Sequence, residues 1–291
     1  MPQAVLLTGA TGFLGSHLCR ALIERGHTVQ AIRRHSSDLS RLGPLAGQVR
    51  WHCAPDGLEA PFSGPHIPDA VIHCATLYGR HGESPVLMLE ANALLPVRLY
   101  HLAAQRGVPL FLNTDTILDP ALNLYALGKH QAVQWLMRAG GPTRVLNLKV
   151  QHFYGPGDDP AKFITWLVTQ CLANVPEIRL TDGRQQRDFI YVSDVVGAML
   201  ALLECEAPGS GPGGGFATYE IGSGNPVAVR DLVELIHKLT GSRSRLSFGA
   251  VPYRPGEPML TRADTAALRA LGWRPQVQLP EGLARTIEAQ L

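Results

Sequence analysis

Short apolar runs alternate with longer segments of helical period through the first half of the chain. The apolar runs have the length of buried strands, and the segments between them place apolar residues three and four positions apart, as amphipathic helices do. This alternation predicts an α/β fold with a doubly wound parallel sheet of the Rossmann type and helices on both faces. We expect strands at residues 4–7, 48–53, 70–75, 109–113 and 143–150, and a helix stop followed by a strand within residues 26–32. Helices are expected at residues 16–25, 87–105 and 124–138.

A glycine-rich turn follows the first expected strand and opens the first helix. Gly9 permits the tight turn, Gly12 lets a pyrophosphate approach the backbone, and Gly15 allows the helix to pack on the strand. The free N–H groups at the helix N-terminus carry positive partial charge, which favours phosphate. Glycines at this spacing between a strand and a helix predict a dinucleotide site, and an ordinary glycine-rich turn is the alternative.

The end of the second strand indicates which dinucleotide binds. An Asp or Glu there would accept a hydrogen bond from the ribose 2′-hydroxyl of NAD(H), but this chain has Arg33 and Arg34. Guanidinium groups suit a 2′-phosphate, so NADP(H) is favoured and NAD(H) stays possible. An ordinary basic turn at a strand end is the alternative interpretation.

The regular alternation ends near residue 155, and the rest of the chain predicts a smaller C-terminal lobe built from discontinuous pieces. We assign residues 1–155 and about 188–222 to the dinucleotide-binding domain, and about 156–187 and 223–291 to a substrate-binding lobe. The Gly- and Pro-rich residues 206–215 are expected to form an exposed loop. Further helices are expected at residues 162–174, 194–204, 229–240 and 264–271, and strands at residues 178–180 and 188–192.

Composition excludes several classes of protein. A hydrophobic content of 45% with 17% charged residues is typical of a globular chain and not of a disordered one. The net charge of +2, without a basic run among aromatic residues, gives no reason to expect a nucleic-acid partner. No apolar run reaches membrane-spanning length and no signal peptide precedes the first strand, so we expect no membrane association and a cytoplasmic location. Scattered cysteines and histidines predict reduced thiols and no metal site.

Tyr125 and Lys129 are four residues apart on the expected helix, so both side chains lie on one face. The preceding strand ends in the polar residues 113–116, at the sheet edge where ligands collect. Reduction of a carbonyl leaves an alkoxide that needs a proton, and a free tyrosine with a pKa of about 10 is a poor proton shuttle at neutral pH. A nearby ammonium group lowers that pKa, and a hydroxyl such as Thr114 can hold the same oxygen. An ordinary pair of helix-surface residues is the alternative.

With these motifs the chain resembles the extended short-chain dehydrogenase/reductases that act on nucleotide sugars, the NAD-dependent epimerase/dehydratase type. The resemblance covers nearly the whole chain. It implies hydride exchange between a nicotinamide and a ring carbon of a nucleotide-diphosphate sugar, in a protein that forms a homodimer. The motifs that carry it lie at residues 8–15, 72–75, 92, 125–129, 154–156, 187–194 and 271–275.

The resemblance also implies residue roles. Tyr125 would be the catalytic acid/base, Lys129 would bond the nicotinamide ribose and tune Tyr125, and Thr114 would take the family's Ser/Thr position. Cofactor contacts are implied for Gly9, Thr11, Gly12, Phe13, Leu14, Gly15, Arg33, Arg34, Cys74, Ala75, Asn92, Tyr125 and Lys129. Substrate contacts are implied for Tyr78, Asp115, Thr116, His152, Arg187 and Arg254. The two arginines of this set would bind the diphosphate, with a surface ion pair as the alternative for each, and His152 could equally be a core histidine.

Departures from the family's pattern narrow the reaction. The family's dehydratases carry Asp-Glu after the catalytic threonine, whereas this chain has Asp115-Thr116, so dehydration is not expected. Residues 149–154, together with residues 113–116, resemble the CDP-abequose synthase type of 4-ketoreductase. We therefore expect NADPH-dependent reduction of the 4-keto group of a nucleotide-linked 4-keto-6-deoxyhexose, in deoxysugar biosynthesis. The alternatives are a nucleotide-sugar 4-epimerase with retained NAD(P) and, from another class, a non-catalytic NADP(H)-binding sensor.

Overall fold

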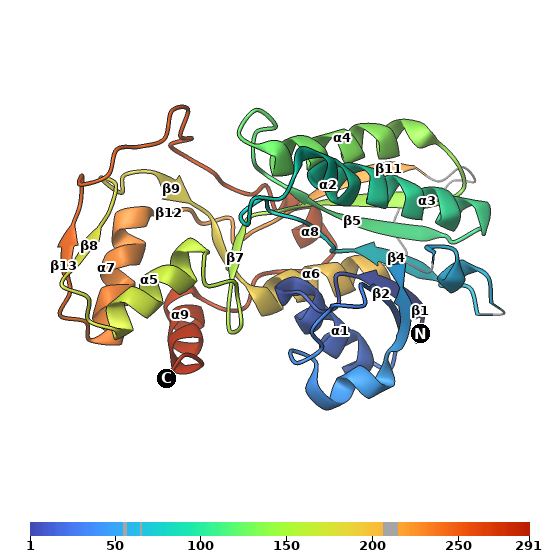
Figure 1. Ribbon diagram of the computed structural model, residues 1–291, viewed down its shortest axis with the longest axis horizontal. Helices are drawn as coiled ribbons and strands as arrows, with labels where there is room; N and C mark the ends of the chain where they lie inside the picture. Colours follow the sequence, from blue (N-terminus) through green and yellow to red (C-terminus); the bar gives the residue numbers. More distant parts are fainter. Residues whose placement is uncertain (55–56, 65, 206–214) are drawn as a thin grey trace. The chain divides into compact units, whose positions relative to one another are not determined.

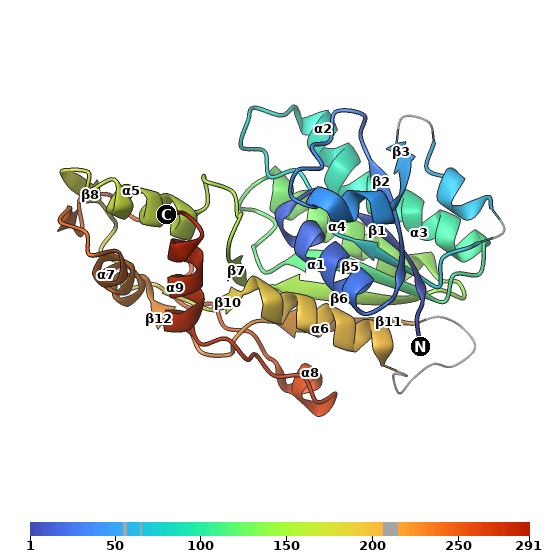
Figure 2. The same ribbon diagram turned by 90° about the horizontal axis from the view of Figure 1, so that it is seen from below.

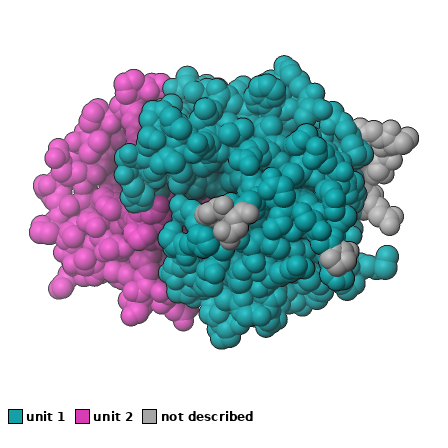
Figure 3. Space-filling model, turned by 45° about the vertical axis from the view of Figure 1, so that its right-hand side comes forward, with its two compact units in different colours: residues 1–150, 196–219 teal, residues 151–195, 220–291 magenta. Residues whose placement is uncertain are grey.

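The computed structural model describes the whole chain except residues 55–56, 65 and 206–214. The loop expected at residues 206–215 therefore lies almost entirely outside the described residues. The described chain forms two compact units (Figures 1 and 3). Unit 1 comprises Met1–Val150 and Val196–Tyr219, and unit 2 comprises Gln151–Val195 and Glu220–Leu291.

Unit 1 is built on a seven-stranded sheet in the order β11-β6-β5-β4-β1-β2-β3. Strands β1 to β6 pair in parallel, as the sequence predicts. The order reverses beside β1, because the chain runs from β1 to β2 and β3 on one side and then returns to β4 on the other, which is where ligands bind in such sheets. The strands are β1 (Ala4–Thr8), β2 (Thr28–Arg33), β3 (Arg50–Cys53), β4 (Ala70–His73), β5 (Leu110–Thr116), β6 (Arg144–Val150) and β11 (Phe216–Ile221).

Helices cover both faces of this sheet, which confirms the doubly wound α/β class. Helices α2, α3 and α4 lie over one face, and α1 and α6 lie over the other (Figures 1 and 2). Strands covered on both sides must be apolar on both sides, and residues 5–7 and 70–72 are fully buried. The helices are α1 (Phe13–Glu24), α2 (Pro85–Leu89), the π-helical segment η4 (Glu90–Leu94), α3 (Leu95–Gln105), α4 (Leu124–Ala139) and α6 (Val192–Glu204), with 3-10 turns η1 (Gly43–Gln48) and η3 (Ala60–Phe62).

Unit 1 differs from the expected pattern in three places. The helix expected at residues 87–105 contains the π-helical segment η4 between α2 and α3. Strand β5 continues to Thr116, beyond the expected bounds of 109–113, so the strand ends in all four polar residues 113–116. Strand β11 was not expected, because most of its residues are partly exposed and it has no continuous apolar run.

Unit 2 contains three two-stranded sheets and four helices. Helix α7 has the expected bounds, whereas α9 was not expected from the sequence. In the described part of the chain, no helix is long and apolar enough to cross a membrane. The strand pairs are β7 (His152–Tyr154) with β10 (Phe189–Tyr191), β8 (Glu177–Arg179) with β13 (Arg245–Ser247), and β9 (Gln186–Arg187) with β12 (Val227–Ala228). The helices are α5 (Phe163–Leu172), α7 (Val229–Thr240), α8 (Ala266–Ala270) and α9 (Leu279–Glu288).

Asp188 holds three segments of unit 2 together. Its side chain is fully buried and accepts hydrogen bonds from the Ser223 N–H at 2.7 Å, the Gly224 N–H at 2.9 Å and the Ala263 N–H at 3.0 Å. The Ser223 hydroxyl donates to the same carboxylate at 2.6 Å. The expected domain division lay near residue 188, whereas the structure groups residues 151–195 in unit 2, where β10 also pairs with β7.

Candidate active site

The glycine-rich turn joins β1 to α1 and leaves the first turn of the helix open to a ligand. Gly9 has φ +74°, and the Gly12 N–H donates to its carbonyl oxygen at 2.9 Å, which closes the turn. A Cβ at Gly9 would lie 2.7 Å from the Ala75 backbone nitrogen, and one at Gly15 would overlap the Gly9 carbonyl oxygen. Among the described residues, no side chain caps α1 and no acidic residue lies in its first turn. The N–H groups of this turn therefore fit the pyrophosphate of a dinucleotide.

Arg33 is the last residue of β2, and its side chain packs against Trp51. Its guanidinium carbon lies 5.6 Å from the ring centroid of Trp51, within cation–π range. The ring is held in turn by a hydrogen bond from the Trp51 indole N–H to the Ala46 carbonyl at 2.9 Å. Within the described residues, Arg33 Nε is buried and has no hydrogen-bond acceptor, a demand that an anionic ligand group would satisfy. The neighbouring Arg34 is exposed.

The ends of β1, β4 and β5 are joined by a buried network around His73. Thr8 Oγ1 lies 2.9 Å from His73 Nδ1, and the Thr114 hydroxyl donates to the His73 carbonyl at 2.8 Å. Burial, with the nearby Lys129 charge, holds the pKa of His73 well below its usual value, so the ring is neutral. Burial also raises the pKa of the adjacent Cys74 thiol to about 12, which leaves it unreactive.

Lys129 projects from α4 into this buried network. Its side chain is 2% exposed, and Nζ donates to the Thr114 carbonyl at 2.8 Å. Burial lowers the pKa of Lys129 to about 8, against the opposing effect of Asp115, so the ammonium is mostly protonated at pH 7. The Asp115 carboxylate accepts hydrogen bonds from Asn147 Nδ2 at 2.8 Å and from the Thr116 N–H at 2.7 Å. Asp115 is thus held by the protein's own donors beside a buried cation.

Tyr125 lies in the first turn of α4, which Asn123 caps by accepting a hydrogen bond from the Ala126 N–H at 2.8 Å. The phenol ring is partly buried and packs on Tyr78, with ring centroids 4.9 Å apart. Burial raises the pKa of Tyr125, and the nearby Tyr78 and Asp115 raise it further, whereas a hydrogen bond with the Thr116 side chain and the charge of Arg80 lower it. Tyr125 is therefore protonated at neutral pH.

These contacts differ from two sequence-based expectations. Lys129 was expected to lower the pKa of Tyr125, but its ammonium is bonded to a backbone carbonyl, and Arg80 is the cation that lowers this pKa. Thr114 was expected to hold the tyrosine oxygen, but its hydroxyl is bonded to the His73 carbonyl, and Thr116 makes the hydrogen bond to Tyr125. The sequence contained no signal that singled out Arg80.

Asn92 lies on the π-helical segment η4 and is fully buried. Its side-chain oxygen accepts hydrogen bonds from the Thr76 hydroxyl at 2.9 Å and the Leu77 N–H at 3.0 Å, and its amide donates to the Leu77 carbonyl at 2.8 Å. A Cβ at Gly128, between Tyr125 and Lys129 on α4, would lie 2.9 Å from the Asn92 Cβ. Asn92 thus fixes the loop after β4, because its side-chain oxygen and its amide both form hydrogen bonds to that loop.

Of the remaining predicted cofactor contacts, Thr11 and Phe13 are partly buried at the glycine turn, and Leu14 is buried.

The predicted substrate residues of unit 2 differ in their surroundings. Arg187 is 6% exposed, forms an ion pair with Glu257 and donates to the Gln186 carbonyl at 2.8 Å. Arg254 is exposed on a turn closed by the Glu257 N–H. Burial and the neighbouring Arg187 lower the pKa of His152 to about 4, so the ring is neutral at pH 7. Sequence reasoning could not identify Glu257 as the partner of Arg187, because the two lie far apart in the chain.

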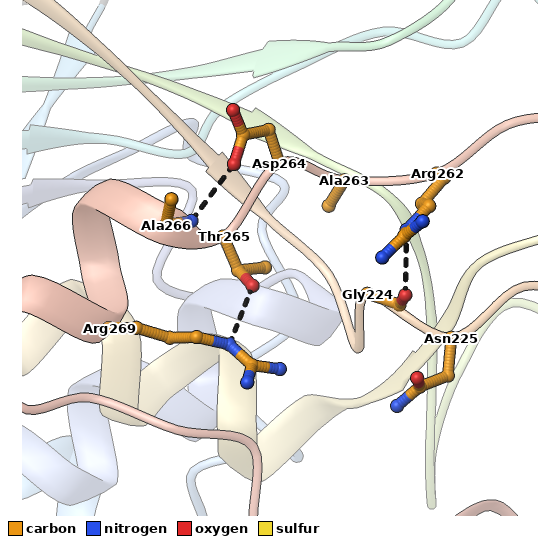
Figure 4. Close-up of a pocket in the computed structure, with 8 residues that line it drawn as sticks. All are labelled: Gly224, Asn225, Arg262, Ala263, Asp264, Thr265, Ala266 and Arg269. Carbon is orange, nitrogen blue, oxygen red and sulfur yellow. Dashed lines mark hydrogen bonds between the residues drawn. The ribbon is translucent and has the colours of Figure 1, made fainter.

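A separate polar pocket of about 590 Å³ lies in unit 2 (Figure 4). Two arginines that line it are held through their ε nitrogens: Arg262 donates to the Gly224 carbonyl at 3.0 Å and Arg269 to the Thr265 hydroxyl at 3.0 Å. None of the residues predicted from the sequence to bind cofactor or substrate lines this pocket. Nowhere in the described ranges do three or more His, Cys, Asp or Glu side chains form a metal-binding group.

Comparison with known proteins identifies relatives along nearly the whole chain. A model of the NAD dependent epimerase/dehydratase family matches residues 5–222. The CDP-abequose synthase of Salmonella typhimurium is 31% identical over 304 residues, which cover 99% of this chain and 98% of the relative. The UDP-glucose 4-epimerase of Mycolicibacterium smegmatis is 28% identical, with 97% of each chain covered. Among solved structures, MoeE5 in complex with UDP-glucuronic acid and NAD has a TM-score of 0.80 at 29% identity, covering 99% of this chain and 98% of that chain.

Proposed function

Because the chain belongs to the NAD dependent epimerase/dehydratase family, and so is an NAD(P)-dependent enzyme that modifies nucleotide sugars, we propose that it is an NADPH-dependent reductase of the 4-keto group of a nucleotide-linked 4-keto-6-deoxyhexose. One observation favours hydride exchange at a ring carbon over dehydration. From β5, the Thr116 side chain acts on Tyr125 through a hydrogen bond and the Asp115 carboxylate acts through its charge. That carboxylate already accepts hydrogen bonds from Asn147 and a backbone N–H. The site is thus better suited to donating a proton to oxygen than to removing one from carbon.

In the proposed mechanism NADPH supplies the hydride when it is bound. Tyr125 donates the proton to the ketone oxygen, and the burial that raises its pKa keeps it in the protonated form that a reduction needs. The Thr116 side chain holds the tyrosine hydroxyl in place. Lys129 fixes the end of β5 through the Thr114 carbonyl and would contact the nicotinamide ribose. The glycine turn between β1 and α1 would hold the pyrophosphate.

The two threonines of β5 give a direct test of this arrangement. Thr116→Val should lower kcat about tenfold or more, because it removes the hydrogen bond that positions Tyr125. It also removes the acceptor of the partly buried Leu118 N–H, so we expect a small loss of stability as well. Thr114→Val should mainly lower the free energy of unfolding, by about 1–3 kcal/mol, because the buried His73 carbonyl loses its donor. Steady-state rates and thermal unfolding of both variants distinguish the two effects. A larger fall in kcat for Thr114→Val would return the catalytic role to Thr114.

Arg33 and Arg34 are the proposed contacts for the 2′-phosphate of NADP(H). The buried Arg33 Nε, which has no acceptor among the described residues, supports this preference. Replacing both residues with Ala should weaken NADPH by about 1.5–3 kcal/mol, the value of a charge-assisted hydrogen bond, and should change NADH much less. Calorimetric dissociation constants for both cofactors measure the difference. Equal losses for NADPH and NADH would contradict the assignment.

Arg254 and Arg187 are the proposed contacts for the substrate diphosphate, with Tyr78, Asp115, Thr116 and His152 as further substrate residues. Arg254 is exposed and offers its guanidinium for a bidentate contact, whereas Arg187 already has Glu257 as its partner. Neutral His152 can donate or accept one hydrogen bond to a sugar hydroxyl. A panel of CDP-, dTDP-, GDP- and UDP-linked 4-keto-6-deoxy sugars, followed by NADPH absorbance, tests the proposed reaction and identifies the base. Interconversion of two sugars without net loss of NADPH would favour a 4-epimerase, as the mycobacterial relative is named.

A homodimer is proposed through the outer surfaces of α2–α4. Leu87 and Leu94 on the α2–η4 segment, and Leu127 and Trp135 on α4, are exposed apolar side chains, with Trp135 65% exposed. Exposed apolar side chains gathered on two adjacent helices mark an interaction surface. Trp135→Lys should convert a dimer to a monomer in light-scattering chromatography, whereas Leu239→Lys on α7 of unit 2 should not. A wild-type chain that elutes as a monomer at all concentrations would contradict this proposal.

A further inference from the structure

The loop after β4 brings two further side chains toward Tyr125. Asn92 fixes this loop through three hydrogen bonds to Thr76 and Leu77. Asn92 thus holds both the N–H and the carbonyl of Leu77, and Tyr78 is the next residue in the loop. A side chain on such a rigid loop can keep a defined orientation toward α4.

Tyr78 and Arg80 form a stack on the Tyr125 ring. The Tyr78 and Tyr125 ring centroids are 4.9 Å apart with an interplanar angle of 43°. The Arg80 guanidinium carbon lies 4.9 Å from the centroid of the Tyr78 ring. Both distances lie in the ranges of favourable aromatic and cation–π contacts. The loop thus carries a positive charge to the neighbourhood of the Tyr125 hydroxyl, with Tyr78 as the intervening ring.

The charges around Tyr125 show why this cation matters. Asp115 on β5 and Tyr78 on the loop oppose formation of a tyrosinate, and burial opposes it more strongly. On α4 itself, the Lys129 ammonium is bonded to the Thr114 carbonyl. The Thr116 hydrogen bond and the positive charge of Arg80 favour the anion. A tyrosine that gives up its proton in a buried site needs such a counter-charge.

We propose that Tyr78 and Arg80 are positioning residues for proton transfer by Tyr125, with Tyr78 orienting the phenol ring and Arg80 stabilising the tyrosinate left when the proton has moved to the substrate oxygen. The phenolate then takes a proton back from solvent. This inference rests on the proposed role of Tyr125 as the acid. It holds equally for a reductase and for an epimerase, because both reactions exchange a proton with Tyr125.

Arg80→Gln is the test variant, with Arg80→Lys as the charge-conserving rescue and Arg106→Gln as the matched control. Arg106 is an exposed arginine of unit 1 that precedes the amino end of β5. Tyr78 follows the carboxyl end of the neighbouring parallel strand β4, so the two lie at opposite ends of these strands. We expect Arg80→Gln to lower kcat about tenfold, which corresponds to one pKa unit of Tyr125. The KM for NADPH and its calorimetric Kd should not change. Arg80→Lys should recover most of the rate, and Arg106→Gln should match the wild type.

The pH profile separates this role from a purely structural one. In the direction of alcohol oxidation, Tyr125 must lose its proton first, so the rise of kcat/KM with pH should move about one unit higher in Arg80→Gln. Tyr78→Leu should cause the same shift, because Arg80 then loses the ring over which it lies, and Arg80→Gln should add little to Tyr78→Leu. Tyr78→Phe keeps that ring and removes a hydroxyl that opposes the tyrosinate, so the profile should not move to higher pH. An unshifted profile with a wild-type kcat would overturn the inference while leaving the reductase proposal intact. A wild-type chain that moves no hydride to or from any sugar would overturn both.

Discussion

Replacing Tyr125 with Phe should lower kcat for the keto sugar by about 10²–10⁴-fold, because general acid catalysis contributes that much. The change removes the hydroxyl and its hydrogen bond with Thr116 but keeps the ring that packs on Tyr78. Folding and NADPH binding should therefore survive, which thermal unfolding and calorimetry would check. Steady-state rates across the accessible pH range measure the catalytic loss.

Tyr219→Phe is the matched control for this substitution. Tyr219 lies on β11 in the same unit and is partly exposed, so its hydroxyl should not affect turnover. Rates for Tyr125→Phe within a few-fold of wild type at every pH would remove Tyr125 as the acid. They would also remove the role inferred for Tyr78 and Arg80.

Asp188→Ala should destabilise the chain by more than about 4 kcal/mol. Losses of this size occur when a buried hydrogen-bond network is broken. The carboxylate accepts from three backbone N–H groups and from the Ser223 hydroxyl. Alanine leaves these donors without an acceptor, and each buried donor left unsatisfied costs roughly 1–3 kcal/mol. We expect a large fall in the unfolding midpoint in denaturant, or a chain that does not accumulate in folded form.

Two further variants serve as comparisons: Asp188→Asn is the conservative replacement, and Glu234→Ala is a surface control. The asparagine keeps one acceptor oxygen and should give an intermediate loss of stability. Glu234 is exposed on α7, so its replacement should stay within about 0.5 kcal/mol of wild type, as is usual for surface positions. An unfolding free energy for Asp188→Ala within about 1 kcal/mol of wild type would show that the loops at 222–224 and 263 are held by other contacts.

The glycine turn and the parallel sheet could be predicted from the sequence because both depend on local patterns. The strand–glycine–helix order is contiguous in the chain, and buried parallel strands appear as continuous apolar runs. Helix α9 was missed although Leu279, Leu283 and Ile287 recur at helical spacing. Strand β11 escaped prediction because its exposed positions interrupt the apolar pattern. For such elements tertiary packing decides the structure more than local sequence.

Contacts between side chains that lie far apart in the chain could not be predicted from local sequence patterns. Arg187 could be proposed as a diphosphate contact from its motif, but its pairing with Glu257 depends on how a distant turn folds back. The choice between the two β5 threonines has a similar origin. Side chains two residues apart in a strand point to the same face, so only the position of α4 decides that Thr116, not Thr114, meets Tyr125.

The most direct test of the proposed reaction compares NADPH consumed with sugar formed. The enzyme is incubated with C4-deuterated NADPH and each of the CDP-, dTDP-, GDP- and UDP-linked 4-keto-6-deoxy sugars, and the products are analysed by NMR. We expect one NADPH to be oxidised for each 4-hydroxy sugar formed from at least one of these substrates, with deuterium at C4 of the sugar. Sugar interconversion with no net oxidation of NADPH, or no deuterium transfer to any of the four, would contradict the assignment as a 4-ketoreductase.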